Sequence, residues 1–356
     1  MLLNIQVLRA TAALLVVVVH LEALGRPLGL QSEIFDLFAV GVDLFFVISG
    51  FIMVHATRRH PLSPGRFLLN RLLRIAPLYW LLTLGVFALA LASPGLLGTT
   101  AASWPDFLRS LAFVPYQRMD GTMRPMLFVG WSLNLEMAFY ALFAATLTLK
   151  DRNRGVLAGV LMLAGVVGLG AVMGTALPAE LRFLSQPLLL EFAGGMAIGW
   201  LYPHLPASAA MARGAAIVGI IALSILVLVA RWPLPGGWPV SLPPACLAVL
   251  AALVAEKGGL RMHWQPALVL GNASYALYLT HPFVTQAWAI ASIRSGLLSP
   301  ATAPALIVAA IACAIAVGLL VHLAVERPLE RLTRQIPATP MWQARLRNTP
   351  AAEHAR

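Results

Sequence analysis

Long apolar segments recur along the whole chain, and they limit the possible folds more than any other feature. A bilayer core about 30 Å thick is crossed by about 20 residues of helix, which satisfies its own backbone hydrogen bonds in lipid. Segments of that kind occur about ten times, near residues 5–24, 37–56, 73–92, 128–148, 156–176, 184–202, 214–230, 242–255, 267–288 and 303–325. The sequence therefore predicts an all-α, polytopic membrane helix bundle of about ten transmembrane helices.

The charge content excludes several other classes of protein. Only 11% of the 356 residues are charged, against about 25% in soluble domains. The net charge of +11 could indicate a nucleic-acid partner, but the basic residues lie in short segments between the apolar ones, as the positive-inside rule predicts. We expect no nucleic-acid binding. Cys246 and Cys313 lie inside apolar segments without metal-ligand spacing, so we expect no metal site.

The same basic segments predict the orientation of the chain. With ten spans, residues 58–74, 150–154 and the region after 325 fall on one side of the membrane, which should be the cytoplasmic side. Both termini are then cytoplasmic. We expect a transmembrane domain over residues 1–334 and a disordered cytoplasmic tail over 335–356, which is rich in Pro, Arg and Ala.

Arg9 and His20 are two ionisable residues within the first apolar segment. They are eleven residues apart, which returns a helix to within roughly 20° of its starting direction and separates the side chains by about 16 Å. We therefore expect both to face one interior channel. Ionisable residues at membrane depth are functional by default, although Arg9 could instead extend its charged end toward the headgroups.

Two further sets of polar residues should lie inside the bundle. Asp43, Glu136 and Glu191 are placed with His20 in the outer half of the bilayer, which predicts one polar pocket. Arg71 and Arg74 are three residues apart, so both face one way, near the cytoplasmic end of the third segment. Their planar guanidinium groups suit phosphate, but arginines at such a position also anchor topology and bind lipid headgroups.

The segment SYALYLTHPF contains four further polar residues, Ser274, Tyr275, Tyr278 and His281. These could line the same interior cavity. They could equally be ordinary residues of the aromatic belt at the membrane surface. The sequence leaves both interpretations open.

Five motifs in a fixed order make the chain similar to the acyltransferase-3 family of polytopic membrane acyltransferases, from Gln6 to about Glu330. They are the Arg-x10-His pattern of Arg9 and His20, GVDLFFVISGF with Asp43, the Arg-x-x-Arg pair Arg71 and Arg74 before IAPLYW, WSLNLEMAFY with Glu136, and SYALYLTHPF. The variants IQVLR and SLNLEM resemble the branch that acetylates bacterial exopolysaccharides such as succinoglycan.

This resemblance implies transfer of an acyl group, most often acetyl from acetyl-CoA, to a hydroxyl of an exopolysaccharide or lipid-linked sugar at the bacterial inner membrane. Arg9, Arg71 and Arg74 would then bind the acyl-CoA. His20 would act as general base on the acceptor hydroxyl or accept the acyl group itself. Glu136 or Asp43 would orient His20, and we favour Glu136. The implied partners are acyl-CoA, a glycan acceptor and membrane lipid, with no metal.

Two other readings of the function remain open. The acceptor could be a lipid, peptidoglycan or a secreted small molecule. A secondary transporter or flippase would also place polar groups at membrane depth. Uptake of labelled substrate into vesicles without consumption of acyl-CoA would favour a transporter.

Overall fold

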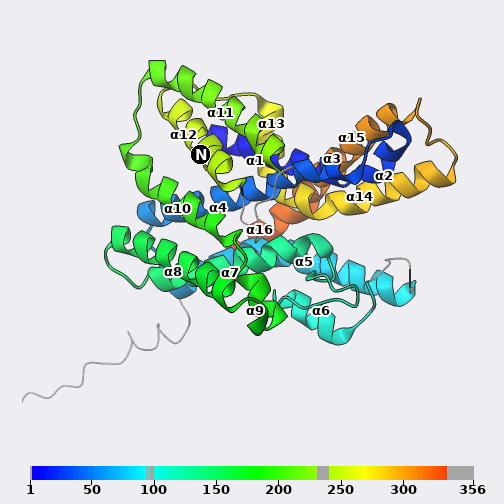
Figure 1. The fold of residues 1–356 in the computed structure, drawn as a ribbon, viewed down its shortest axis with the longest axis horizontal. Coiled ribbons are helices and arrows are strands. Elements are labelled where there is room, and N and C mark those ends of the chain that lie inside the picture. The colour runs from blue at the N-terminus through cyan, green and yellow to red at the C-terminus, as the bar shows by residue number, and fades with distance from the viewer. Residues whose placement is uncertain (1, 94, 96–99, 231–239, 335–356) are drawn as a thin grey trace, which may run out of the picture.

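The computed structural model describes residues 2–93, 95, 100–230 and 240–334, and these form helices joined by loops (Figure 1). The all-α expectation is confirmed for this part of the chain, in which Gln117 and Met123 form one isolated β-bridge. The predicted tail 335–356 lies outside the described residues. The α-helices are α1 Leu3–Val19, α2 Glu22–Gly25, α3 Ser32–Asp36, α4 Gly41–Arg59, α5 Pro64–Ala92, α6 Trp104–Leu111, α7 Trp131–Thr146, α8 Arg152–Met173, α9 Ala179–Leu184, α10 Leu189–Leu201, α11 Ala209–Val229, α12 Leu242–Lys257, α13 Gln265–Asn272, α14 Ser274–Arg294, α15 Ala303–Val321 and α16 Arg327–Arg334.

Six helical segments of the described chain are long and apolar enough to cross a membrane, and a seventh is added if α1 and the bent segment after it form one span. Each predicted apolar segment coincides with helix, but several of these helices are short or interrupted. Helix α10 has 13 residues and α12 has 16, fewer than the about 20 that a full crossing needs. Helix α14 has 21 residues but carries many polar side chains along its first half. The count of ten spans and the cytoplasmic termini stay predictions.

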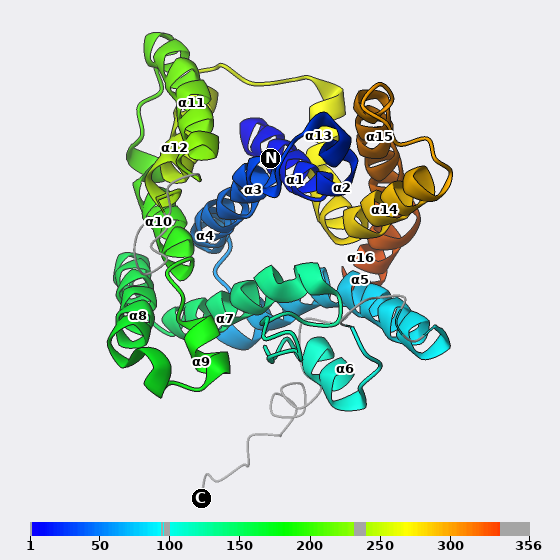
Figure 2. The ribbon, with the colours of Figure 1, turned by 45° about the vertical axis from the view of Figure 1, so that its right-hand side comes forward.

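Helices α1 and α4, with the short α3, lie inside a ring formed by the longer helices (Figure 2). Helix α4 packs along α10, and α1 packs against α13 and α14. Glycines allow the close contact of α4 with α10. A Cβ atom on Gly50 would lie 2.1 Å from the Phe192 carbonyl oxygen, and one on Gly195 would lie 2.0 Å from the Val47 carbonyl oxygen. Small residues at such contacts bring the helix backbones together, which fixes α4 at the centre.

The junction of α15 and α16 is a turn of π-helix, His322–Glu326. Such turns insert one extra residue into a helix and are frequent at functional sites. Here the π-turn buries His322 and Glu326 and brings Glu326 to Arg74 of α5. His322 Nδ1 lies 2.7 Å from a carboxylate oxygen of Glu326, and Arg327 donates to His322 Nε2 at 3.1 Å.

Candidate active site

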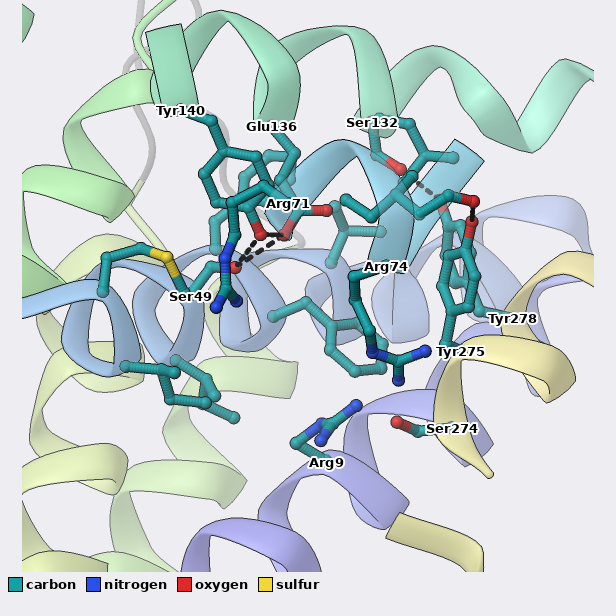
Figure 3. Close-up of a pocket in the computed structure, with 18 residues that line it drawn as sticks. Arg9, Ser49, Arg71, Arg74, Ser132, Glu136, Tyr140, Ser274, Tyr275 and Tyr278 are labelled. Atoms are coloured by element: carbon teal, nitrogen blue, oxygen red, sulfur yellow. Dashed lines mark hydrogen bonds between the residues drawn. The ribbon is translucent and has the colours of Figure 1, made fainter. Parts of the chain in front are cut away.

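A cavity of about 200 Å³ lies between α1, α4, α5, α7 and α14, and the three arginines that the sequence grouped together all line it. Figure 3 shows Arg9, Arg71 and Arg74 directed toward this shared space from α1 and α5. We call it the arginine cavity. Ser274, Tyr275 and Tyr278 of α14 also line it, so these residues face the interior of the bundle.

Arg74 is held by two carboxylates from the C-terminal end of the described chain. Its Nη1 lies 2.5 Å from Glu326 and 2.5 Å from Glu330. Its guanidinium also lies 5.4 Å from the centre of the Tyr275 ring. The guanidinium group of Arg74 therefore forms a fixed part of the cavity wall, and its positive charge is balanced by the two carboxylates.

Arg9 and Arg71 differ from Arg74 in their surroundings. Among the described residues neither forms an ion pair. Arg9 donates a long hydrogen bond of 3.4 Å to Gln6, and Arg71 lies 5.7 Å from the centre of the Phe67 ring with its buried Nε lacking a hydrogen-bond partner. A cation inside a membrane protein is costly without a counter-ion. Glu136 lines the same cavity and offsets one of these two charges, and the remaining positive charge favours an anionic ligand there.

Glu136 also lines the arginine cavity and does not contact His20. One of its carboxylate oxygens accepts hydrogen bonds of 2.6 Å from Ser49 and 2.6 Å from Tyr140 (Figure 3). The structure therefore shows no contact through which Glu136 would orient His20, the role predicted for it from the sequence. Its position instead places one negative charge opposite the arginines.

Asp43 and Glu191 lie apart from both His20 and Glu136. Asp43 accepts a hydrogen bond from Ser241, whose hydroxyl also lies 3.2 Å from Glu191. The expectation of one polar pocket for His20, Asp43, Glu136 and Glu191 is therefore wrong. The physical reason is helical direction, because six residues along α4 turn the chain by about 240°, so that Asp43 faces α12 while Ser49 faces Glu136 of α7.

A second cavity of about 470 Å³ contains His20, and we call it the histidine cavity. Arg124, Phe128 and Trp131 contribute to its wall from the segment that leads into α7. Arg118 shapes this segment by donating hydrogen bonds to the carbonyl oxygens of Arg124 at 3.0 Å and of Met126 at 3.1 Å. Aromatic rings beside polar groups suit a sugar, which has both C–H faces and hydroxyl groups.

The local backbone explains how the His20 ring is held. His20 ends α1, where the chain bends by 61°. Its backbone N–H bonds to the Val17 carbonyl at 3.1 Å rather than to the Val16 carbonyl. The Val16 oxygen is therefore available to the His20 ring, whose Nδ1 lies 3.0 Å from it.

His281 of α14 contacts the His20 ring, as does Phe128, whose ring centre lies 5.5 Å away. Its Nε2 lies 3.2 Å from His20 Nδ1, with the ring centres 4.8 Å apart. His281 is fully buried. The sequence named this residue but did not separate an interior role from an ordinary position in the aromatic belt.

The two cavities adjoin each other and share Val42 and Tyr278 as lining residues. The Tyr278 hydroxyl is fixed by hydrogen bonds with Ser132 at 2.7 Å and with the Val129 carbonyl at 3.0 Å. Arg9 and His20 were expected in one channel. They instead line neighbouring cavities that this wall separates.

These features define a polytopic membrane protein with its polar side chains gathered around two adjoining internal cavities. The chain belongs to the acyltransferase-3 family, whose model, described as an acyltransferase domain, matches residues 2–321. It is an acyltransferase, as the motifs in the sequence suggested.

Three relatives give the comparison more detail. The chain is 38% identical over 272 residues to the exopolysaccharide production protein ExoZ of Rhizobium meliloti, covering 75% of this chain and 83% of ExoZ. It is 30% identical to the putative membrane-bound transacylase BcsY of Komagataeibacter xylinus, over 68% of this chain and 65% of BcsY. It is 28% identical to the acyltransferase MdmB of Streptomyces mycarofaciens, over 68% of this chain and 67% of MdmB. No solved structure matches the chain.

Proposed function

We propose that this protein is an O-acyltransferase of the bacterial inner membrane that moves an acetyl group from acetyl-CoA to a hydroxyl of an exopolysaccharide or another cell-surface glycan. One observation carries the proposal: a cavity with two guanidinium groups that have no ion-pair partner within the described part of the chain adjoins a cavity with a histidine. The identity with ExoZ, which is named for exopolysaccharide production, supports a glycan as the acceptor.

The arginine cavity is the proposed donor site. Arg9 and Arg71 would hold phosphate oxygens of the CoA, and Arg74 would shape the wall beside them. Typical pockets for whole small-molecule ligands measure about 300–1,000 Å³, whereas this cavity measures about 200 Å³. On this proposal only part of the acyl-CoA enters it, with the thioester pointing toward Tyr278. Glu136, which accepts hydrogen bonds from Ser49 and Tyr140, would lie across the same cavity and offset part of the positive charge.

The histidine cavity is the proposed acceptor site, and His20 is its general base. His20 takes the proton of the acceptor hydroxyl as the oxygen attacks the thioester carbon. The C–S bond then breaks, and the proton passes to the departing sulfur, so the products are the sugar ester and free CoA. Because the thioester and His20 start in neighbouring cavities, the wall at Tyr278 and Val42 must open for the transfer.

The experiment uses the purified protein in lipid nanodiscs with radiolabelled acetyl-CoA and exopolysaccharide from cells that lack the gene. We expect label in the polysaccharide, an added mass of one acetyl group per modified sugar, and loss of both in His20→Ala. The exposed His204 offers a matched control, because His204→Ala should transfer at the normal rate. Full transfer by His20→Ala would contradict the assigned base. Transport of sugar into vesicles without consumption of acetyl-CoA would overturn the enzymatic proposal.

A further inference from the structure

Two histidine rings meet edge to face between α1 and α14, and the function proposed above uses only one of them. His20 lines the histidine cavity, whereas His281 lines neither of the two cavities. His281 is fully buried, so neither substrate touches it in this arrangement. His281 can act on the reaction through the His20 ring, which its Nε2 approaches at 3.2 Å, while its ring centre also lies 6.0 Å from that of Tyr278.

The neighbouring carbonyl groups determine which ring nitrogens carry protons. A carbonyl oxygen only accepts hydrogen bonds. His281 Nδ1 lies 3.2 Å from the Leu277 oxygen, so this nitrogen carries a proton and His281 Nε2 presents a lone pair. His20 Nδ1 lies 3.0 Å from the Val16 oxygen and 3.2 Å from His281 Nε2, so it carries a proton that both acceptors share. The Nε2 of neutral His20 then has a free lone pair.

The sequence of α14 favours this arrangement. Pro282 follows His281 and has no N–H, so the Tyr278 carbonyl lacks the donor that a regular helix would supply four residues later. The Tyr278 carbonyl is thus free beside the Leu277 carbonyl, whose oxygen lies 3.2 Å from His281 Nδ1. The Leu277 contact holds the His281 ring with its Nε2 directed at His20.

We propose that His281 is a positioning residue that holds His20 in the tautomer whose Nε2 accepts the proton of the acceptor hydroxyl. This inference rests on the proposed function, because it assigns a partner to the proposed base. The second histidine would do for His20 what a carboxylate does in a catalytic triad, namely fix the tautomer and the ring direction. After proton uptake the bond from His20 Nδ1–H to His281 becomes a stronger, charge-assisted one.

Kinetics of two substitutions test the proposal. His281→Leu removes the acceptor, and we expect kcat to fall by about 10- to 100-fold, as misplaced catalytic groups cause, with unchanged KM values for acetyl-CoA and glycan. His281→Gln places an amide oxygen near the position of Nε2, so we expect it to restore much of the lost kcat. His204→Leu, at an exposed position, is the control. Normal kcat in His281→Leu would overturn the inference.

Nitrogen-15 NMR of the unmodified protein provides a measurement that does not depend on activity or on folding of a variant. Histidine-labelled protein in nanodiscs should give a His20 signal with protonated Nδ1 and unprotonated Nε2, assigned by its absence from His20→Ala. A His20 ring protonated at Nε2 would overturn the inference. The two proposals also fail separately: transfer by His20→Ala removes the proposed base, whereas a dead His20→Ala beside a fully active His281→Leu removes only the role of His281.

Discussion

At the scale of single residues, Arg9 combines partial burial with a charge that has no ion-pair partner among the described residues, which is the basis of the proposed donor site. It lies within α1 and lines an internal cavity, and its hydrogen bond to Gln6 is long at 3.4 Å. A neutral amide does not balance a full positive charge. On the proposed function, the remaining hydrogen-bonding capacity of the planar guanidinium would serve the phosphates of the donor.

Replacement of Arg9 should affect the donor more than the acceptor. We expect Arg9→Ala to raise KM for acetyl-CoA by about 10-fold or more, the effect of losing about 1.4 kcal/mol of binding free energy, while KM for the glycan stays constant. Arg9→Lys keeps the charge but loses the planar pair of donors, so it should recover only part of the affinity. Steady-state kinetics with Arg213→Ala, an exposed arginine, as control would measure this. Unchanged KM for acetyl-CoA in both variants would refute the role of Arg9.

The sequence predicted that the three arginines lie together, but it did not predict the neighbours of Glu136 and His20, for a physical reason. Arg71 and Arg74 share a face by their spacing, and burial of Arg9 has few purposes other than function, so the grouping of the three arginines was accessible. The partners of Glu136 could not be predicted, because the depth of a side chain in the membrane does not determine which neighbour it faces. The contact of His281 with His20 depends on packing of α14 against α1, which no local pattern reports.

At the scale of helices, the contact of α4 with α10 depends on residues without side chains. A Cβ atom on Gly195 would lie 2.0 Å from the Val47 oxygen and 2.8 Å from the Phe51 nitrogen. Backbone atoms cannot rotate away as side-chain ends can, so α10 would have to shift.

We therefore expect Gly195→Ala to destabilise the fold by about 1–3 kcal/mol, the usual range for overpacking. Gly165→Ala is the matched control, because a Cβ atom on this glycine of α8 would meet nothing within 4 Å. Thermal unfolding in detergent, followed by size-exclusion fluorescence, would measure the difference. Equal melting temperatures for the two variants would contradict the close packing described here.

The π-turn between α15 and α16 is the second element with a testable role. It presents Glu326 to both Arg74 and His322. Glu326→Gln keeps the shape but removes the charge, so we expect a loss of about 1–3 kcal/mol, as for a buried group deprived of its partner. Melting temperatures of this variant and of Glu33→Gln, an exposed control, would test it. A stability equal to the control would show that the ion pair contributes nothing.

Helix positions themselves were predictable from the sequence, whereas their grouping into spans was not. Apolar windows mark helix in lipid because the backbone has no alternative partner there. An apolar stretch of sequence does not predict that the chain bends by 61° just after Val19, or that Ala273 separates α13 from α14. Such breaks depend on neighbouring helices that cover the interrupted backbone.

At the scale of the whole molecule, the main feature is that a wall of side chains separates the two adjoining cavities. Tyr278 contacts both cavities and is held by Ser132 and the Val129 carbonyl. We expect Tyr278→Ala to join the cavities, so that water reaches the thioester and acetyl-CoA is hydrolysed faster without acceptor. Tyr278→Phe keeps the ring and should leave this background low. Release of free CoA thiol without glycan would measure both, and an equal background in the two variants would contradict the separating role of the ring.

The ion pairs of Arg74 also have a consequence for synthesis of the chain. Arg74 and Glu326 are separated by 252 positions, and α16, which carries Glu330, packs on α5. A ribosome must therefore translate nearly all of the described chain before Arg74 meets its two carboxylates. Until then, α5 of the nascent chain is inserted without a counter-charge for Arg74. A product truncated before residue 326 should therefore lack a finished donor site, even though most of its apolar helices are already in the membrane.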